Sequence, residues 1–391
     1  MTGHPPEEDA GGFQPLRGIR VIDFTRLLAG PYATMTLAEL GADVVKVEQP
    51  GTGDETRTWG PPFAADGSSA YFHAINRGKR SVVLDLADER DRRRAHQLMA
   101  GADVVVESFR PGVAERLGIG HEEVLSRFPH LVYASISGFS STGPMSAEPG
   151  TAVTVEAESG LMHVTGYEGG EPVRSGVAMV DIATGMSMIN GVLAALLERT
   201  RTGRGRRLEV SLFGTALSAL GTVIASASAG GPAPRAWGSS HPSIVPYRAF
   251  AAADGSVVLG ATNDPMFARL ATALGMPEEL GLDRWRRNAG RVDDREALES
   301  VLAARISGLP VDEVVRRLQD HRVLVARVRR PDDAARGEQA AALGMIVDDD
   351  GILIARSALG GNGTRMLGRA PALGEHDAEL LGDDRPARPA P

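Results

Sequence analysis

The sequence predicts an α/β protein that combines a Rossmann-like large domain, built on a parallel sheet, with a smaller α+β domain. Short runs rich in Val and Ile alternate with helical patterns in the N-terminal half of the chain. The length of 391 residues is enough for two or three domains of about 150 residues each. A stretch rich in Gly, Ala, Ser and Pro at 221–238 then separates this half from a second unit.

Five apolar runs are the expected strands of the sheet, and they occupy residues 18–24, 43–48, 81–86, 102–107 and 131–136. Pro31 opens the first expected helix, which extends to Gly41, because a residue without an N–H costs little in the first turn. A charged helix is expected over about 88–100. Strands separated by helices form βαβ units with right-handed crossovers, so neighbouring strands should be parallel.

A long helix is expected over about 182–200, where the glycines of 202–205 end it because they tolerate positive φ. The stretch 221–238 is interpreted as a linker or a mobile loop. In the second unit, roughly 240–330, Asp254-Gly255 between two apolar runs predicts a hairpin, and helical patterns follow. Residues 1–15 should form a loose leader and residues 383–391 a frayed tail.

Composition excludes several classes of protein. The chain has 42 Lys and Arg against 50 Asp and Glu, and this net charge of −8 disfavours a nucleic-acid-binding protein. The absence of cysteine removes disulfides, cysteine zinc sites, iron–sulfur clusters and thiol nucleophiles. No run approaches the roughly 18–20 apolar residues of a membrane span. We therefore expect a soluble cytoplasmic enzyme.

Common catalytic motifs do not occur. The nine histidines are scattered, so no metal site is expected, and the densest ligand-like cluster, at 375–377, is interpreted as a solvated turn. The residues after the first strand do not form GxGxxG, and no GxSxG or Walker A sequence occurs. A dinucleotide cofactor would therefore lack its usual phosphate cradle.

Several short sequence blocks instead resemble those of a known family, both in their residues and in their order along the chain. They occupy residues 23–31, 40–48, 51–54, 76–81, 107–112, 135–139, 159–162, 181–185 and 202–205. This set resembles the family III CoA-transferases, the CaiB/BaiF group, and the likeness extends from about residue 16 to 375.

The resemblance implies an interlocked homodimer of ring-like chains. It also implies a large CoA-binding domain at 1–224, to which residues 326–391 return, and a small inserted domain at 225–325. The active site would lie between the large domain of one chain and the small domain of its partner, with His241 and Tyr247 as candidates to close it. Acyl-CoA and a free carboxylic acid would be the substrates, with no tightly bound cofactor and no nucleic-acid or membrane partner.

Asp181 matches the nucleophilic aspartate of the family. From the residues alone, it is a lone carboxylate between the apolar segment 177–180 and the long helix, where an N-cap is the simplest interpretation. The two roles are compatible, because a helix N-terminus stabilises a carboxylate and a developing oxyanion. The family mechanism proceeds through an aspartyl anhydride and an aspartyl-CoA thioester. The segment 238–240 is a candidate source of oxyanion donors.

The resemblance also implies the residues that contact CoA. The arm would pass Arg26, Leu27, Leu28 and Ala29, and the nucleotide end would contact Leu84, Phe109, Val113 and Arg116. Four positions depart from formyl-CoA transferase. Gln49 replaces a phosphate-binding arginine, Ser108 replaces an asparagine, and Arg26 and Leu28 replace a histidine and a glutamine. Phosphate binding would then depend on Arg116, Arg110, Arg57 or the pair Lys79-Arg80, and a formyl or oxalyl substrate is disfavoured.

Two alternatives remain open at this point. The first is an α-methylacyl-CoA racemase on the same fold, whose His-Asp pair is replaced here by Thr151 and Ala152, neither of which exchanges protons. Glu156 and Glu158 are near in sequence but need not reach the same point. The second is a non-catalytic CoA-binding protein. The transferase interpretation favours a small dicarboxylic acid as acceptor and succinyl-CoA as donor.

Overall fold

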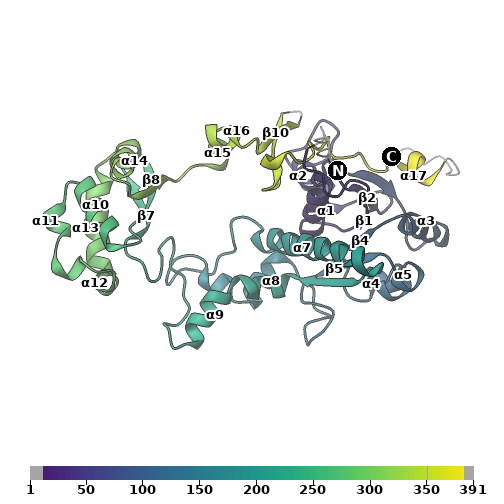
Figure 1. Ribbon diagram of the computed structural model, residues 1–391, viewed down its shortest axis with the longest axis horizontal. Coiled ribbons are helices and arrows are strands. Elements are labelled where there is room, and N and C mark those ends of the chain that lie inside the picture. Colours follow the sequence, from purple (N-terminus) through teal and green to yellow (C-terminus); the bar gives the residue numbers. More distant parts are fainter. Residues whose placement is uncertain (1–11, 350, 383–391) are drawn as a thin grey trace, which may run out of the picture. The chain divides into compact units, whose positions relative to one another are not determined.

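The computed structural model describes residues 12–349 and 351–382, so the tail and most of the predicted leader lie outside the described residues. The chain divides into two compact units (Figure 1). Unit 1 contains the residues up to Leu161, Arg174–Gly231 and the residues from Ala335 on. Unit 2 contains Met162–Val173 and Pro232–Ala334.

Unit 1 is built on a six-stranded parallel sheet, which confirms the predicted α/β class. The strands are β1 (Arg20–Phe24), β2 (Asp43–Glu48), β3 (Arg80–Val83), β4 (Val104–Glu107), β5 (Val132–Ser137) and β6 (Arg207–Ser211). Their order is β3-β2-β1-β4-β5-β6. The order reverses between β1 and β4, and ligands of such sheets bind in the crevice at the carboxyl ends of these strands.

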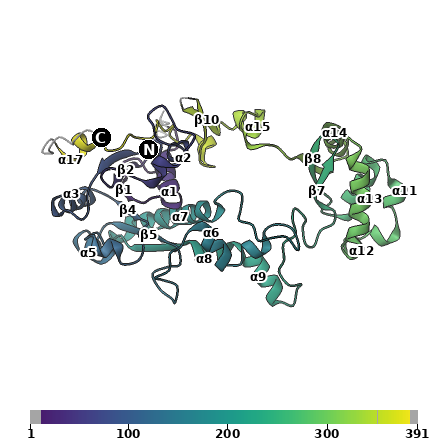
Figure 2. The same cartoon turned by 180° about the vertical axis from the view of Figure 1, so that it is seen from behind.

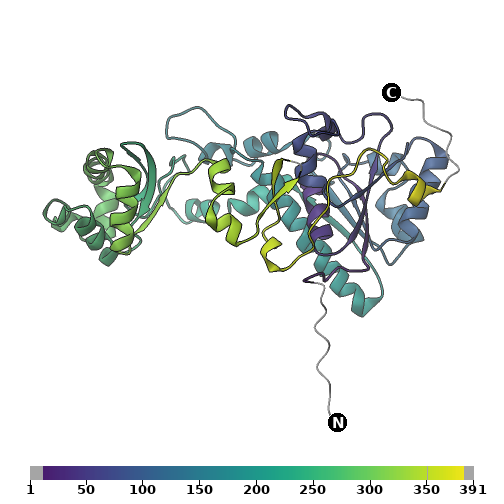
Figure 3. The same cartoon turned by 90° about the horizontal axis from the view of Figure 1, so that it is seen from above.

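Helices cover both faces of the sheet because successive strand residues point to opposite sides. Val21, Val44 and Val104 join the core that includes α1 (Ala29–Glu39) and α7 (Met179–Thr202). Their neighbours Ile22, Val45 and Val105 join the core of α3 (Glu89–Ala100) and α5 (His121–Arg127). Figure 3 shows the sheet between these two layers. The remaining helices of this region are α2 (Ala70–Asn76), α4 (Val113–Arg116), α6 (Ala152–Glu158), α8 (Leu212–Ala219) and α9 (Gly221–Ser228).

The long helix α7 crosses α1 closely at Gly185. A Cβ at this position would lie 2.7 Å from the carbonyl oxygen of Ala29 and 2.9 Å from a ring carbon of Tyr32, so only glycine fits without a shift. Among the described residues, α7 alone is long and apolar enough to cross a membrane. Val192 and Met188 are buried in the core that α7 shares with α1, as in a core helix.

The interpretation of 221–238 as a linker or mobile loop is wrong for its first part. Residues Gly221–Ser228 form α9, directly after α8. None of the residues of α9 is buried. Because the helix buries no apolar face, its sequence lacks the amphipathic pattern by which a helix is usually predicted.

Unit 2 contains a three-stranded antiparallel sheet and several helices. The strands are β7 (Tyr247–Ala252), β8 (Gly255–Gly260) and β9 (Leu324–Arg327), with β7 and β8 forming the predicted hairpin. The helices are α10 (Asp264–Ala273), α11 (Pro277–Leu280), α12 (Asn288–Asp293), α13 (Arg295–Ser307), α14 (Val311–Asp320) and α15 (Pro331–Ala335). Trp285, Leu298 and Leu302 belong to a separate core, which makes this unit a packed body of its own (Figure 2).

The C-terminal segment of the described chain closes one edge of the parallel sheet. It contains α16 (Glu338–Ala342), the hairpin of β10 (Ile346–Asp349) and β11 (Ile352–Ala355), and α17 (Asp377–Leu381). Residues 375–376 lie in a turn with Glu375 exposed, as predicted, but His376 and Asp377 are half-buried against the sheet and not solvated. The amides of Ser81 and Val83 on the edge strand β3 donate to His376 Nδ1, at 3.2 Å, and to Asp377 Oδ1, at 2.8 Å. These side chains replace the missing neighbouring strand.

A cluster of buried charges lies beneath the carboxyl end of β1. Asp23 accepts hydrogen bonds from the backbone N–H of Thr25 at 2.8 Å and from Lys79 Nζ at 3.0 Å. Lys46 Nζ lies 2.8 Å from both the Thr25 carbonyl and a carboxylate oxygen of Asp54. Burial alone would raise the pKa of Asp23, but Lys79 and Lys46 outweigh it and hold this pKa below its usual range.

Replacing Lys79 by alanine should destabilise unit 1 by about 3–5 kcal/mol, since it leaves the charge of Asp23 buried without its partner. Urea unfolding measures the change. The matched control is Arg93→Ala, which removes an exposed ion pair with Glu89 and should leave the midpoint nearly unchanged. Equal midpoints for the two variants would contradict the assigned role of the cluster.

Candidate active site

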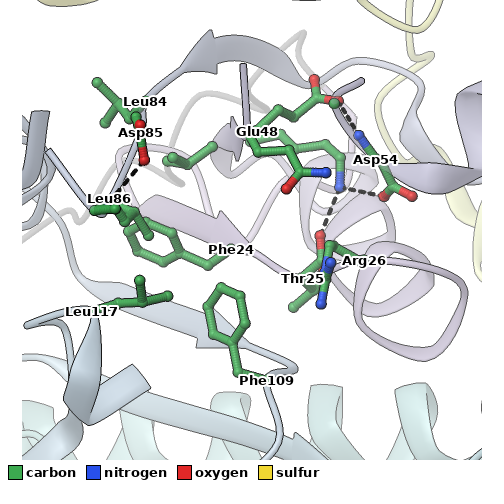
Figure 4. A pocket seen from close by; sticks show the side chains of 15 residues that line it. Phe24, Thr25, Arg26, Glu48, Asp54, Leu84, Asp85, Leu86, Phe109 and Leu117 are labelled. Carbon is green, nitrogen blue, oxygen red and sulfur yellow. Dashed lines mark hydrogen bonds and ion pairs between the residues drawn. The ribbon is translucent and has the colours of Figure 1, made fainter. Parts of the chain in front are cut away.

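A pocket lies at the carboxyl ends of β1–β4, at the point where the strand order reverses. Figure 4 shows Phe24, Leu84, Leu86, Phe109 and Leu117 gathered on its apolar side. These side chains come from three strand ends and from the residue after α4. Apolar walls of this kind suit a flat aromatic group such as a nucleotide base.

The polar side of the pocket consists of charges that the protein already pairs. Lys46 bonds to Asp54 and Thr25, and Glu48 accepts hydrogen bonds from Arg57 Nε at 2.8 Å and from Ser81 Oγ at 2.6 Å. The charges of Lys46 and Arg57 are neutralised by buried carboxylates. These two residues therefore fix the shape of the pocket, and neither is free to bind a phosphate.

The structure therefore corrects three of the phosphate-binding candidates. Arg57 is held by Glu48 and the carbonyl of Pro371, and Lys79 by Asp23. Arg80 is held by Asp43 and Glu379. These pairings were not predictable because the partner carboxylates lie on other elements of the fold, namely β1, β2 and α17.

Three arginines remain as candidates: Arg26 lines this pocket, and Arg110 lines a neighbouring pocket that shares Phe109. Arg110 and Arg116 are exposed and form no ion pair with any described residue, while Arg26 makes a half-exposed pair with Glu55 at 3.2 Å. The Arg26 guanidinium also lies 5.7 Å from the centre of the Phe109 ring, over the apolar wall. We expect these side chains to meet the phosphates of a bound nucleotide.

The turn between β1 and α1 carries the predicted contacts of the CoA arm. Leu27 has a φ of 68°, and a leucine in the left-handed region costs about 1–2 kcal/mol. Contacts on both sides hold the turn: the Arg26 N–H donates to Ser108 Oγ at 3.0 Å, and the Leu27 N–H points at Asp54 Oδ1 at 3.5 Å. Ser108 thus positions the turn. Leu28 precedes α1, and Ala29 is its first residue.

The structure brings part of the predicted set together. Arg26, Gln49, Leu84 and Phe109 line the pocket, and Gln49 also donates to Thr52 Oγ1 at 2.7 Å. Val113 and Arg116 lie on α4, which ends next to the lining residue Leu117. The pocket is also lined by residues that were not predicted from the sequence, among them Phe24, Asp85, Leu86 and Leu117. Phe24, Asp85 and Leu86 stand at or directly after strand ends, and that position was the available signal.

Asp181 lies in the first turn of α7, and its predicted role as an N-cap is wrong. Ala178 occupies the cap position without a side-chain cap, and Asp181 is the third residue of the helix. Its carboxylate forms no hydrogen bond or ion pair with another described residue. Burial, with a contribution from the charge of Glu156, raises the pKa of Asp181 to about 6.

Two connections link Asp181 to the elements that surround the pocket. Asp181 is four residues, about 6 Å along the axis, from Gly185, which lies against the Ala29 carbonyl at the end of the β1–α1 turn. Burial and the charges of Asp181 and Asp54 raise the pKa of Tyr71, on α2, to about 12. Tyr71 therefore lies within electrostatic reach of both the pocket and Asp181.

The candidate oxyanion segment at 238–240 uses two of its amides internally. Gly238 N–H donates to the Gly166 carbonyl at 2.7 Å, and Ser240 N–H donates to the Trp237 carbonyl at 2.9 Å. In the same unit, the rings of His241 and Tyr247 stack 5.8 Å apart. The two bonded amides are not free to bind an oxyanion, so this expectation is not supported.

No group of three or more His, Asp or Glu side chains among residues 12–349 and 351–382 forms a metal site. A doubly wound sheet, a pocket at its switch point and a desolvated carboxylate on α7, which packs against α1, define an α/β enzyme for a nucleotide-containing substrate. The family model of CoA-transferase family III matches residues 16–377, and the chain belongs to this family. The family predicted from the sequence blocks is thereby confirmed.

Named relatives agree with this assignment. The succinyl-CoA:glutarate CoA-transferase of Mus musculus is 44% identical over 306 residues, covering 78% of this chain and 70% of its own. The acetyl-CoA:oxalate CoA-transferase of Acetobacter aceti is 37% identical and covers 97% of both chains. The crystal structure of a CaiB/BaiF family protein from Brucella suis has a TM-score of 0.86 and 36% identity, covering 94% of this chain and 98% of that one.

Replacing Arg110 or Arg116 by alanine should raise the KM for an acyl-CoA about tenfold and leave kcat unchanged. A hydrogen bond to a charged group is worth roughly 1.5–3 kcal/mol, which corresponds to this factor or more. Steady-state kinetics with Arg93→Ala, an exposed arginine on α3, as control measures the effect. An unchanged KM in both Arg110→Ala and Arg116→Ala would assign the phosphates to other side chains.

Proposed function

We propose that this protein transfers CoA from an acyl-CoA thioester, with succinyl-CoA as the favoured donor, to a small dicarboxylic acid. The single observation that supports this most is the half-buried, unpaired carboxylate of Asp181 in the first turn of α7. A carboxylate without a cationic partner is not stabilised by an ion pair, so it keeps its nucleophilicity. The relatives named for glutarate and oxalate both act on dicarboxylic acids, which supports the acceptor class.

The reaction follows from what a carboxylate does to a thioester. An oxygen of Asp181 attacks the donor carbonyl carbon, the carbon–sulfur bond breaks, and CoA thiolate leaves a mixed anhydride behind. The thiolate then attacks the aspartyl carbonyl carbon, which releases the donor acid and forms the aspartyl-CoA thioester. The acceptor carboxylate attacks this thioester, and the released thiolate takes the acceptor acyl group, which frees Asp181. The α7 N-terminus favours the negative charge that develops at each step.

The two alternatives have less support. Thr151 stands at the N-cap of α6 and Ala152 follows it, so the paired His-Asp of a racemase has no counterpart at these positions. The named relatives are CoA-transferases, which disfavours a purely CoA-binding protein. We further propose a cytoplasmic homodimer of interlocked ring-like chains, with a large domain at 1–224 and 326–391 and a small one at 225–325. The exposed Leu217 and Ile224, on α8 and α9, are suited to an interface.

Asp181→Asn should lower CoA exchange at least about a thousandfold, because an amide does not form the anhydride. Incubation with succinyl-CoA and a panel of acids that includes glutarate and oxalate, followed by mass spectrometry, measures both exchange and a CoA adduct on Asp181. Glu198→Gln, which removes a carboxylate from the far end of α7, is the control. Exchange without any adduct on Asp181 would point to another nucleophile.

Activity should also fall on the acid side of a pKa near 6. Asp181 attacks only as the anion, so kcat/KM for the donor should decline about tenfold per pH unit below this value. A pH profile with a donor that does not titrate in this range measures the acid limb. A rate that stays constant down to pH 4.5 would contradict the raised pKa of Asp181.

A further inference from the structure

Glu156 is a buried carboxylate that the transferase chemistry does not use. It lies on α6 with 2% of its surface exposed. Its Oε2 accepts a hydrogen bond from the Ser175 N–H at 2.9 Å. No Lys, Arg or His among the described residues forms an ion pair with it. Burying a carboxylate without a cation costs folding free energy, so the presence of Glu156 at this position calls for an explanation.

The elements around Glu156 contribute a second carboxylate, that of Asp181, and no described cation that forms an ion pair with Glu156. α6 packs against α7 and α8. The sequence of α8 has no titratable residue, and Asp181 is the acidic residue of the first turn of α7. Tyr71 of α2 lies within electrostatic reach of Asp181, as described above. The exposed Arg174, next to Ser175, forms no ion pair with Glu156.

Glu156 stands on α6, which packs against the helix that carries Asp181. Its carboxylate contributes, after burial, to the raised pKa of Asp181. The same repulsion applies to any reaction state in which Asp181 is an anion. In the anhydride and in the thioester the Asp181 side chain is neutral, and the negative charge has moved to the CoA thiolate or to a free acid. Repulsion from Glu156 therefore destabilises free Asp181 and not its acylated forms.

We propose that Glu156 is a positioning residue whose negative charge shifts the equilibrium of Asp181 toward its covalently occupied forms, and whose hydrogen bond to Ser175 holds the segment that leads into α7. This inference rests on the proposed function of Asp181. The hydrogen bond from Ser175 gives Glu156 a second role, that of holding the connection into α7. Ser175 stands on this connection, six positions before Asp181.

Two substitutions separate the charge from the hydrogen bond. Glu156→Gln removes the charge and keeps an oxygen that accepts from Ser175, whereas Glu156→Ala removes both. Glu158→Gln is the matched control, since Glu158 is exposed and lies two residues further on the same helix. With succinyl-CoA alone, mass spectrometry of the intact protein gives the fraction present as the CoA adduct, and steady-state kinetics gives the pH profile.

For Glu156→Gln we expect an adduct-to-free ratio about three- to tenfold lower than in the unmodified protein, and an acid limb of kcat/KM displaced to lower pH. Glu156→Ala should show the same displacement and also a lower kcat. Glu158→Gln should match the unmodified protein in both measurements. A merely structural Glu156 would change kcat or stability without moving the acid limb, so an unmoved limb and an unchanged adduct ratio in Glu156→Gln overturn the inference.

The same experiment distinguishes this inference from the proposed function. If the unmodified protein exchanges CoA and forms the Asp181 adduct while Glu156→Gln behaves identically, only the role of Glu156 is wrong. If the unmodified protein forms no adduct on Asp181, the proposed mechanism itself is wrong. Thermal unfolding of each variant establishes that Gln at 156 is compatible with a folded chain.

Discussion

The ion cluster of Asp23, Lys46, Asp54 and Lys79 is the constraint on which the arrangement of the site depends. It joins the end of β1, the end of β2, the segment after β2 and the residue before β3. Asp23 also accepts from Thr34 Oγ1 at 2.7 Å, so the first helix is tied to the same point. Because each charge is paired, the strand ends hold the shape of the pocket without presenting a free charge to its interior.

Carboxylates have opposite roles in the ion cluster and in the first turn of α7. In the cluster, cations and hydrogen bonds stabilise the anion, and the pKa of Asp23 lies below its usual range. In the first turn of α7, burial without a cation raises the pKa of Asp181. The same functional group is thus a structural anchor where it is paired and a reactive group where it is not.

The strands were predictable because runs such as Val104–Glu107 are rich in β-branched residues and buried on both faces. The sixth strand, Arg207–Ser211, was missed because its residues are half-exposed and two are charged. Asp181 was found only through the family resemblance, since neither spacing nor composition marks a lone carboxylate. The pairing of Arg57 depends on how the segment after β2 folds back onto Glu48, and the burial of Glu156 depends on how α6 is turned. Local sequence patterns do not record either.

The closure of the β3 edge has a consequence during translation. The amide of Ser81 is bonded by a side chain 295 positions later, and that of Val83 by one 294 positions later. The ribosome therefore finishes β3 long before the residues that cover it exist. A nascent chain carries this open edge through most of its synthesis, and neighbouring chains on the same messenger are exposed to it until the last segment emerges.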